Sequence, residues 1–282
     1  MSGLLVPLLH LLVGIAVPLA SFATGLRSSD PRWFWKRPRL LGRSLVAVLL
    51  IVPIVGTLLV ELIPVNGVVR AGIVVSLLSV GVGPARLPKR TEDPRELAGY
   101  QIGLNMALMI LAVVFVPAAV AVHGALFHHQ LSLEWSRVAE LVFLRVFLPF
   151  AAGLAVARWR PGFAARVERD APQLVAVAML IVAAVAVLVT WHRLMGLSAG
   201  AWFSCAAVAM AAIAIGHVAG GPAGETRAVL ASFSAIRFPA LALLLTSIVP
   251  RGALLIPVVV AYLICSALLV AVYRAAMGRG RS

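Results

Sequence analysis

The run Ser232-Phe233-Ser234-Ala235-Ile236-Arg237-Phe238-Pro239 places an arginine and a proline in the middle of an apolar segment, 228–249. That segment is long enough to cross a bilayer, for which about 20 residues suffice. Proline removes a backbone donor and kinks a helix, and an ionisable side chain at bilayer depth indicates a functional site. Because arginine pairs with carboxylates and sulfates through a planar set of donors, Arg237 predicts a binding site for an anion. Its neighbours in the predicted site are Ser234, Phe238 and Pro239.

A second segment, Pro84-Ala85-Arg86-Leu87-Pro88, repeats the order of a small or apolar residue, Arg, a large apolar residue and Pro. One interpretation is that each proline only kinks its helix, since proline is common in membrane helices. The matched pair favours a site, because two interrupted segments in corresponding positions are typical of transporters built on inverted repeats. We therefore include Pro84 and Arg86 in the predicted site. Arg237 is the main candidate, since Arg86 lies close to Lys89 and could reach the interface by snorkelling.

Two amide side chains, Gln101 and Asn105, stand four residues apart on one face of the next predicted helix. They are expected either to line a cavity beside the two breaks or to pack between helices.

The composition identifies an integral membrane protein made of helices. Of 282 residues, 62% are hydrophobic and 12% charged, whereas a soluble domain has about 25% charged residues. The net charge of +14 does not indicate nucleic-acid binding, because the basic residues cluster in short gaps between apolar runs. The cysteines and histidines show no metal-ligand spacing, and no phosphate loop or nucleophile elbow is present. We expect no enzyme, no catalytic residue, no metal and no cofactor.

Nine spans are predicted in a single integral membrane domain covering residues 1–282. Their approximate bounds are 3–24, 44–63, 71–86, 97–122, 138–157, 174–191, 199–218, 228–249 and 253–273. Loops on one side, with the C-terminal tail, hold 18 of the 24 Lys and Arg residues, and the opposite side holds four. We expect the protein to lie in the cell membrane. By the positive-inside rule, its N-terminus is then outside the cell and its C-terminus is in the cytoplasm. The third and eighth spans then cross in opposite directions.

The chain resembles the bile acid–sodium symporter family over nearly its whole length. The matching stretches include Ser21-Phe22-Ala23-Thr24-Gly25-Leu26, Val80-Gly81-Val82-Gly83-Pro84 and Val146-Phe147-Leu148-Pro149-Phe150-Ala151-Ala152-Gly153-Leu154. The resemblance implies an all-α inverted-repeat transporter fold in which two broken helices, spans three and eight, cross at the site. It also implies a panel, about 3–63 and 138–191, that packs against a core, about 68–122 and 198–273, with substrate between them.

Both breaks depart from the family pattern. At the first, the family's Pro-Gly-Gly followed by Ser-Asn is replaced by Pro84-Ala85-Arg86 without Ser-Asn, and at the second, two positions differ. The family has a glutamate where this chain has Phe233, and a glutamine where it has Arg237, and those family residues help to hold sodium. Sodium requires oxygen ligands, whereas arginine has donors only. We therefore expect a carrier of a small organic anion that works by alternating access without the usual sodium coupling. The alternative is a membrane scaffold or sensor that retains the fold but does not transport.

Overall fold

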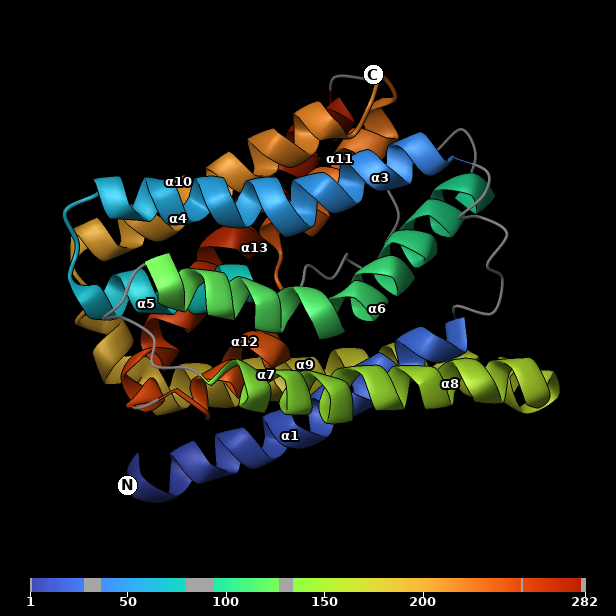
Figure 1. Cartoon of the computed structure of the whole chain (residues 1–282), viewed down its shortest axis with the longest axis horizontal. Helices are drawn as coiled ribbons and strands as arrows, with labels where there is room; N and C mark the ends of the chain where they lie inside the picture. The colour runs from blue at the N-terminus through green and yellow to red at the C-terminus, as the bar shows by residue number, and fades with distance from the viewer. Residues whose placement is uncertain (1, 28–36, 80–93, 127–133, 250, 280–282) are drawn as a thin grey trace.

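The computed structural model describes residues 2–27, 37–79, 94–126, 134–249 and 251–279. Every regular element in these ranges is a helix (Figure 1). The elements are α1 (Ser2–Arg27), α3 (Pro38–Val46), η1 (Ala47–Ile51), α4 (Val52–Leu62), α5 (Gly67–Leu78), α6 (Pro94–Leu126), α7 (Trp135–Val142), η2 (Phe143–Phe147), α8 (Leu148–Trp159), α9 (Pro161–Met195), α10 (Ala199–Ala219), α11 (Gly224–Ala235), α12 (Pro239–Thr246), η3 (Gly252–Leu254) and α13 (Ile256–Arg279).

Seven helical runs within the described ranges are long and apolar enough to cross a bilayer, so the chain is a multi-pass membrane protein. They are Val6–Arg27, Pro38–Leu62, Glu96–His123, Trp135–Trp159, Gln173–Met195, Ala199–Ala219 and Gly252–Met277. The two remaining predicted intervals, 71–86 and 228–249, contain shorter helices. α5 and α11 each have 12 residues and α12 has 8, whereas a span needs about 20. Seven spans rather than nine are therefore seen, and the count of nine stays a prediction.

Two short π-helices, η1 and η2, lie just before prolines. In η1 the N–H of Val52 bonds to the carbonyl of Ala47, five residues back. The next donor in this register would be residue 53, which is a proline and has no N–H. The carbonyl of Val48 is therefore left without a helical donor. The same arrangement occurs where η2 precedes Pro149, and both prolines lie inside spans.

A proline inside α1 creates a similar free carbonyl, and an arginine from another helix bonds to it. Pro18 cannot donate to the carbonyl of Gly14, four residues earlier. Nη1 of Arg145, in η2, donates to that carbonyl oxygen at 2.9 Å. Arg145 thus finds a backbone partner in α1, as a cationic side chain within a span requires.

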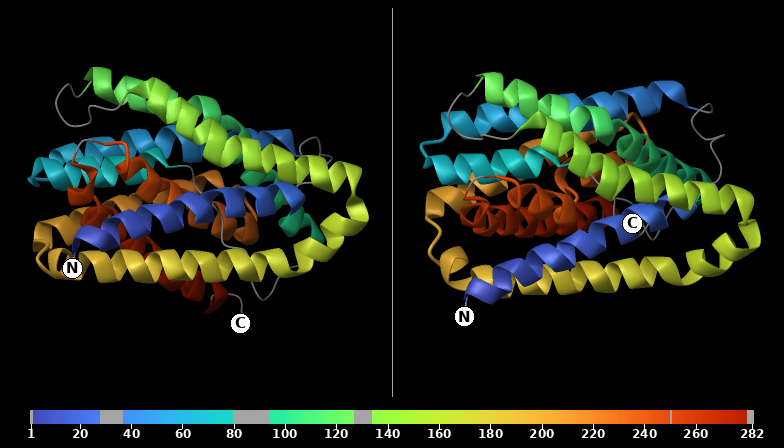
Figure 2. Two further views of the ribbon diagram at one scale, coloured as in Figure 1. Left: turned by 90° about the horizontal axis from the view of Figure 1, so that it is seen from below. Right: turned by 60° about the horizontal axis from the view of Figure 1, so that its bottom comes forward.

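The helices α1, α8 and α9 form one packed group, which lies on the lower side of Figure 1. Both views in Figure 2 show the long helix α9 running beside α1. At the contact of α1 with α8, a methyl added to Gly25 would overlap the carbonyl oxygen of Phe150, and one added to Gly153 would overlap that of Phe22. The two glycines are thus reciprocal, and they allow the two backbones to touch.

A second group is built around α10, which packs against α4, α11 and α13. α4 also packs against α5, and α3 against α6 and α10. α3, α4 and α10 lie on the upper side of Figure 1, with α5 and α6 below them. The short helix α12 contacts α1 and α9 of the first group and α5 and α13 of the second. α12 therefore lies at the junction of the two groups.

Candidate functional site

The stretch around Arg237 forms a non-helical connection between α11 and α12. α11 ends at Ala235 and α12 begins at Pro239. Ile236 and Phe238 have extended backbones, with ψ of 109° and 100°. Proline fits the first position of a helix because its missing N–H would have no partner there, and it favours an extended conformation for the residue before it. The sequence itself thus ends one helix and starts the next.

The side chain of Arg237 is fully buried and bonds to backbone carbonyls. Its Nη1 donates to the carbonyl oxygens of Val48 and Ser79, each at 3.3 Å. The Val48 carbonyl is the one that Pro53 leaves without a helical donor, and Ser79 is the C-cap residue of α5. Within the described part of the chain, Nε and Nη2 have no hydrogen-bond partner. Arg237 therefore links the α11–α12 connection to η1 and to the end of α5.

Two neighbours of Arg237 are also buried. The hydroxyl of Tyr262, in α13, interacts electrostatically with the guanidinium and donates to the carbonyl of Ala235 at 3.3 Å. That carbonyl belongs to the last residue of α11, where helical donors are missing. Ser234 faces α10, since a Cβ added at Gly216 would lie 2.6 Å from its Oγ.

Next to this connection is a cavity of about 220 Å³ between the two helix groups. α1 and α9 form one wall, and α6 with the start of α12 forms the other. The lining residues are Ala20, Ala23, Thr24, Arg27, Gln101, Ile102, Asn105, Met109, Val175, Ala176, Met179, Phe238 and Pro239.

The cavity brings together four of the residues predicted from the sequence. Gln101 and Asn105 enter it from α6, and Phe238 and Pro239 from the start of α12. Arg237 and Ser234 lie in the adjoining packed interior and do not line it. Pro84 and Arg86 fall outside the described residues.

Two polar lining residues, Thr24 and Arg27, were not included in the predicted site. In the sequence, Arg27 follows the first predicted span and counts only among the 18 basic residues that orient the chain. The available signal was helical spacing: residues 20, 23, 24 and 27 recur every three or four positions and so share one face of α1. The Thr24 hydroxyl donates to the carbonyl of Ala20 at 2.8 Å.

The lining combines one cation with two amides and a largely apolar wall. A guanidinium and amide N–H groups can bind a carboxylate or sulfate, while Met109 and Met179 offer adaptable apolar contacts. Among the described residues, no group of three or more His, Cys, Asp or Glu side chains could hold a metal ion.

The sequence matches a family model over most of its length. Residues 12–196 match the model described as the sodium bile acid symporter family. This range includes residues 12–27 of α1, all of α6, both π-helices and the greater part of the cavity lining. A comparison with curated protein sequences gave no significant match. Members of the matched family are transporters, not enzymes. The helical, multi-pass architecture and the family match lead to the same conclusion: this chain belongs to the sodium bile acid symporter family.

Proposed function

We propose that this protein is a secondary carrier that moves a small organic anion across the cell membrane by alternating access. The observation that carries the proposal is the cavity between the two helix groups, where Arg27, Gln101 and Asn105 meet an apolar wall. A pocket lined mainly by apolar groups with a few convergent polar ones is the usual form of a small-molecule site. The positive charge of Arg27 selects an anion.

The two helix groups are proposed as the moving parts. The panel is α1 with α7, η2, α8 and α9, and the core contains the remaining helices. We assign α3 and α4 to the core, because they pack against α5, α6 and α10, whereas the sequence alone placed residues up to 63 in the panel. Sliding of the panel against the core would open the cavity to alternate sides. The proposal keeps nine spans, with α5 and the α11–α12 pair as interrupted ones and the C-terminus cytoplasmic.

Transport is proposed to proceed without the usual sodium coupling. Buried backbone carbonyls near the α11–α12 connection are the kind of oxygen ligand that sodium needs. Arg237 already donates to two of them, those of Val48 and Ser79. The side chain of Phe233, in α11, offers no oxygen. In this proposal Arg237 is a fixed internal cation, and Arg27 makes the charge contact with substrate.

A second candidate function is a membrane scaffold or sensor that keeps the fold without transport. The observation in its favour is that Arg237 is wholly buried against carbonyls and does not face the cavity. On this view the Arg237 contacts hold the α11–α12 connection, η1 and the end of α5 in a single arrangement within the core.

Uptake of labelled organic anions into proteoliposomes separates the two candidates. A carrier takes up at least one carboxylate or sulfate, and Arg27→Gln reduces that uptake at least tenfold. Arg158→Gln is the matched control, because Arg158 is exposed at the end of α8 and lies outside the cavity. Absence of uptake for every anion by correctly folded protein would favour the scaffold. An equal loss of uptake in both variants would mean that the cavity is not the substrate site.

A further inference from the structure

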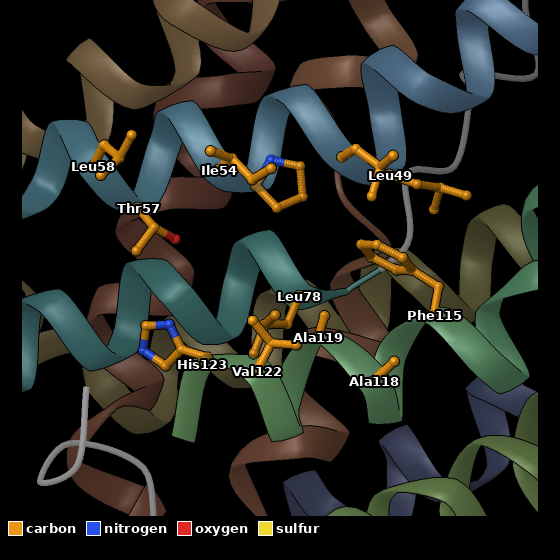
Figure 3. A pocket seen from close by; sticks show the side chains of 12 residues that line it. Leu49, Ile54, Thr57, Leu58, Leu78, Phe115, Ala118, Ala119, Val122 and His123 are labelled. Carbon is orange, nitrogen blue, oxygen red and sulfur yellow. The ribbon is translucent and has the colours of Figure 1, made fainter. Parts of the chain in front are cut away.

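A second concave surface lies between α4 and α6, beside the end of α5. Figure 3 shows α4 above it, α6 below it and the end of α5 behind it. Its volume is about 320 Å³. α6 packs against α3, whereas α4 packs against α5 and α10. The helices α4 and α6 thus diverge, and they leave a groove between them.

The groove opens toward the lipid side of the protein. Ile54, Leu58 and Val122 line it and are 57%, 56% and 58% exposed. They belong to helices that are long and apolar enough to span a membrane. At this depth no water is available to fill an apolar groove. Its occupant must therefore come from the hydrocarbon phase.

The groove has one polar end and one apolar end, as a single bilayer leaflet does. Thr57 and His123, its two polar lining residues, face each other across one end, close to where α4 and α6 finish (Figure 3). Leu49 and Phe115 line the other end. Each is eight residues from its polar counterpart on the same helix, which is about 12 Å along the helix axis. The groove therefore runs from the interface to about the middle of a hydrocarbon core that is about 30 Å thick.

We propose that this groove holds one acyl chain of a membrane phospholipid, with the ester region of the lipid at Thr57 and His123. The hydroxyl and the imidazole can hydrogen-bond to ester and glycerol oxygens. The chain would lie against Leu49, Leu78 and Phe115, which form the apolar part of the lining. Bound in this way, the lipid fills the space between α4 and α6 and supports η1, which carries the Val48 contact of Arg237. The proposal concerns a site separate from the anion cavity and does not depend on transport.

The test is photolabelling of the full-length protein in nanodiscs. The phospholipid carries a diazirine in the half of one acyl chain that is nearer its methyl end. Adducts are located by mass spectrometry of peptides. We expect labelling of the peptides containing Leu49 and Phe115 to exceed that of Leu180 and Leu188 at least fivefold. The latter two are 70% and 72% exposed on α9 and report ordinary contact with bulk lipid.

Two tryptophan variants on α6 provide the matched comparison. Ala119 lines the groove, whereas Ala121 is exposed on another face of the same helix at nearly the same depth. Ala119→Trp reduces the groove adducts at least fivefold, and Ala121→Trp leaves them unchanged. If Ala119→Trp fails to fold, the comparison of α4 and α6 with α9 in the unaltered protein still decides the question. Uniform labelling of all three helices would overturn the proposal. So would efficient disulfide cross-linking of two copies through Ile54→Cys, because the groove would then be an interface between chains.

Discussion

Arg237 donates through Nη1 to the carbonyl oxygen of Val48 at 3.3 Å, at the point where Pro53 removes the helical donor. Arg145 does the same for Gly14, whose carbonyl is freed by Pro18. In both cases a proline inside a span exposes a carbonyl and an arginine from a distant segment bonds to it. Because an unsatisfied carbonyl in hydrocarbon is costly, each arginine stabilises a proline position that would otherwise be unfavourable.

The first prediction concerns coupling between Arg237 and Pro53. Arg237→Met leaves the carbonyls of Val48 and Ser79 without this donor, at a cost of about 1–3 kcal/mol for each unsatisfied group. Methionine also removes the desolvation cost of a buried charge, so the net loss is smaller than the sum. We expect the unfolding free energy to fall by about 1–3 kcal/mol. Unfolding of purified protein in detergent micelles measures the change.

The control is the same substitution in a Pro53→Ala background. Alanine restores an N–H at position 53 that can bond to the Val48 carbonyl. The loss caused by Arg237→Met should therefore shrink by about 1 kcal/mol in that background. Changes that add within about 0.5 kcal/mol would show that the two residues act independently, and the role given to the carbonyl would be wrong.

The position of the break before Pro239 was accessible from the sequence because proline acts locally, whereas the predicted break at Pro84 and Pro88 lies outside the described residues. Pro239 separates α11 from α12 through its fixed backbone and missing N–H, whereas at Pro53 the missing N–H follows a π-helical turn within one continuous helical run. The partners of Arg237 were not accessible. Its two carbonyl acceptors lie 189 and 158 positions away, and every residue offers the same carbonyl group, so residue type carries no signal.

Some of the residues that line the cavity could be predicted from the sequence, and others could not. Gln101 and Asn105 are conspicuous as polar residues within an apolar helix. Arg27 was not, because an arginine at the end of a span is explained equally well by orientation in the membrane. Only the packing of α1 against α9 and α12 distinguishes it from other basic residues.

The second prediction tests the charge preference of the cavity. Asn105→Asp adds a carboxylate to the lining, and at about 8 Å with an effective dielectric constant of about 20 it repels an anion by about 2 kcal/mol. We expect the KM for anion uptake to rise about 30-fold. Asn66→Asp makes the same chemical change outside the cavity, and aspartate still caps α5 at that position. A similar rise in both variants, or no rise in either, would place the anion elsewhere.

The third prediction concerns sodium. Since Arg237 already occupies the carbonyls of Val48 and Ser79, initial uptake into proteoliposomes should be the same within twofold in sodium and in potassium media. The measurement needs equal membrane potential in both media, which an ionophore provides. A tenfold stimulation by an inward sodium gradient would show that sodium is bound at another set of oxygens.

The fourth prediction concerns the contact between α1 and α8. A methyl at Gly25 or Gly153 would overlap a backbone carbonyl of the facing helix, which cannot move aside as a flexible side chain can. Gly25→Ala and Gly153→Ala should each lower the unfolding free energy by about 1–3 kcal/mol, the usual range for overpacking. Gly14→Ala is the control on the same helix, because its added methyl lies 3.6 Å from Arg145 Nη1, an ordinary contact. It should be neutral or stabilising, since alanine favours helix by about 1 kcal/mol over glycine.

The two alanine substitutions at this contact should also be non-additive. Once Gly25→Ala has separated the helices, the carbonyl of Phe22 has already moved away from Gly153, so the second methyl finds space. The double variant should therefore lose less stability than the two single variants together. Thermal unfolding of the four proteins in one detergent measures this. Full additivity would mean that the two glycines do not share one interface, and a loss for Gly14→Ala equal to that for Gly25→Ala would mean that α1 tolerates no added methyl anywhere.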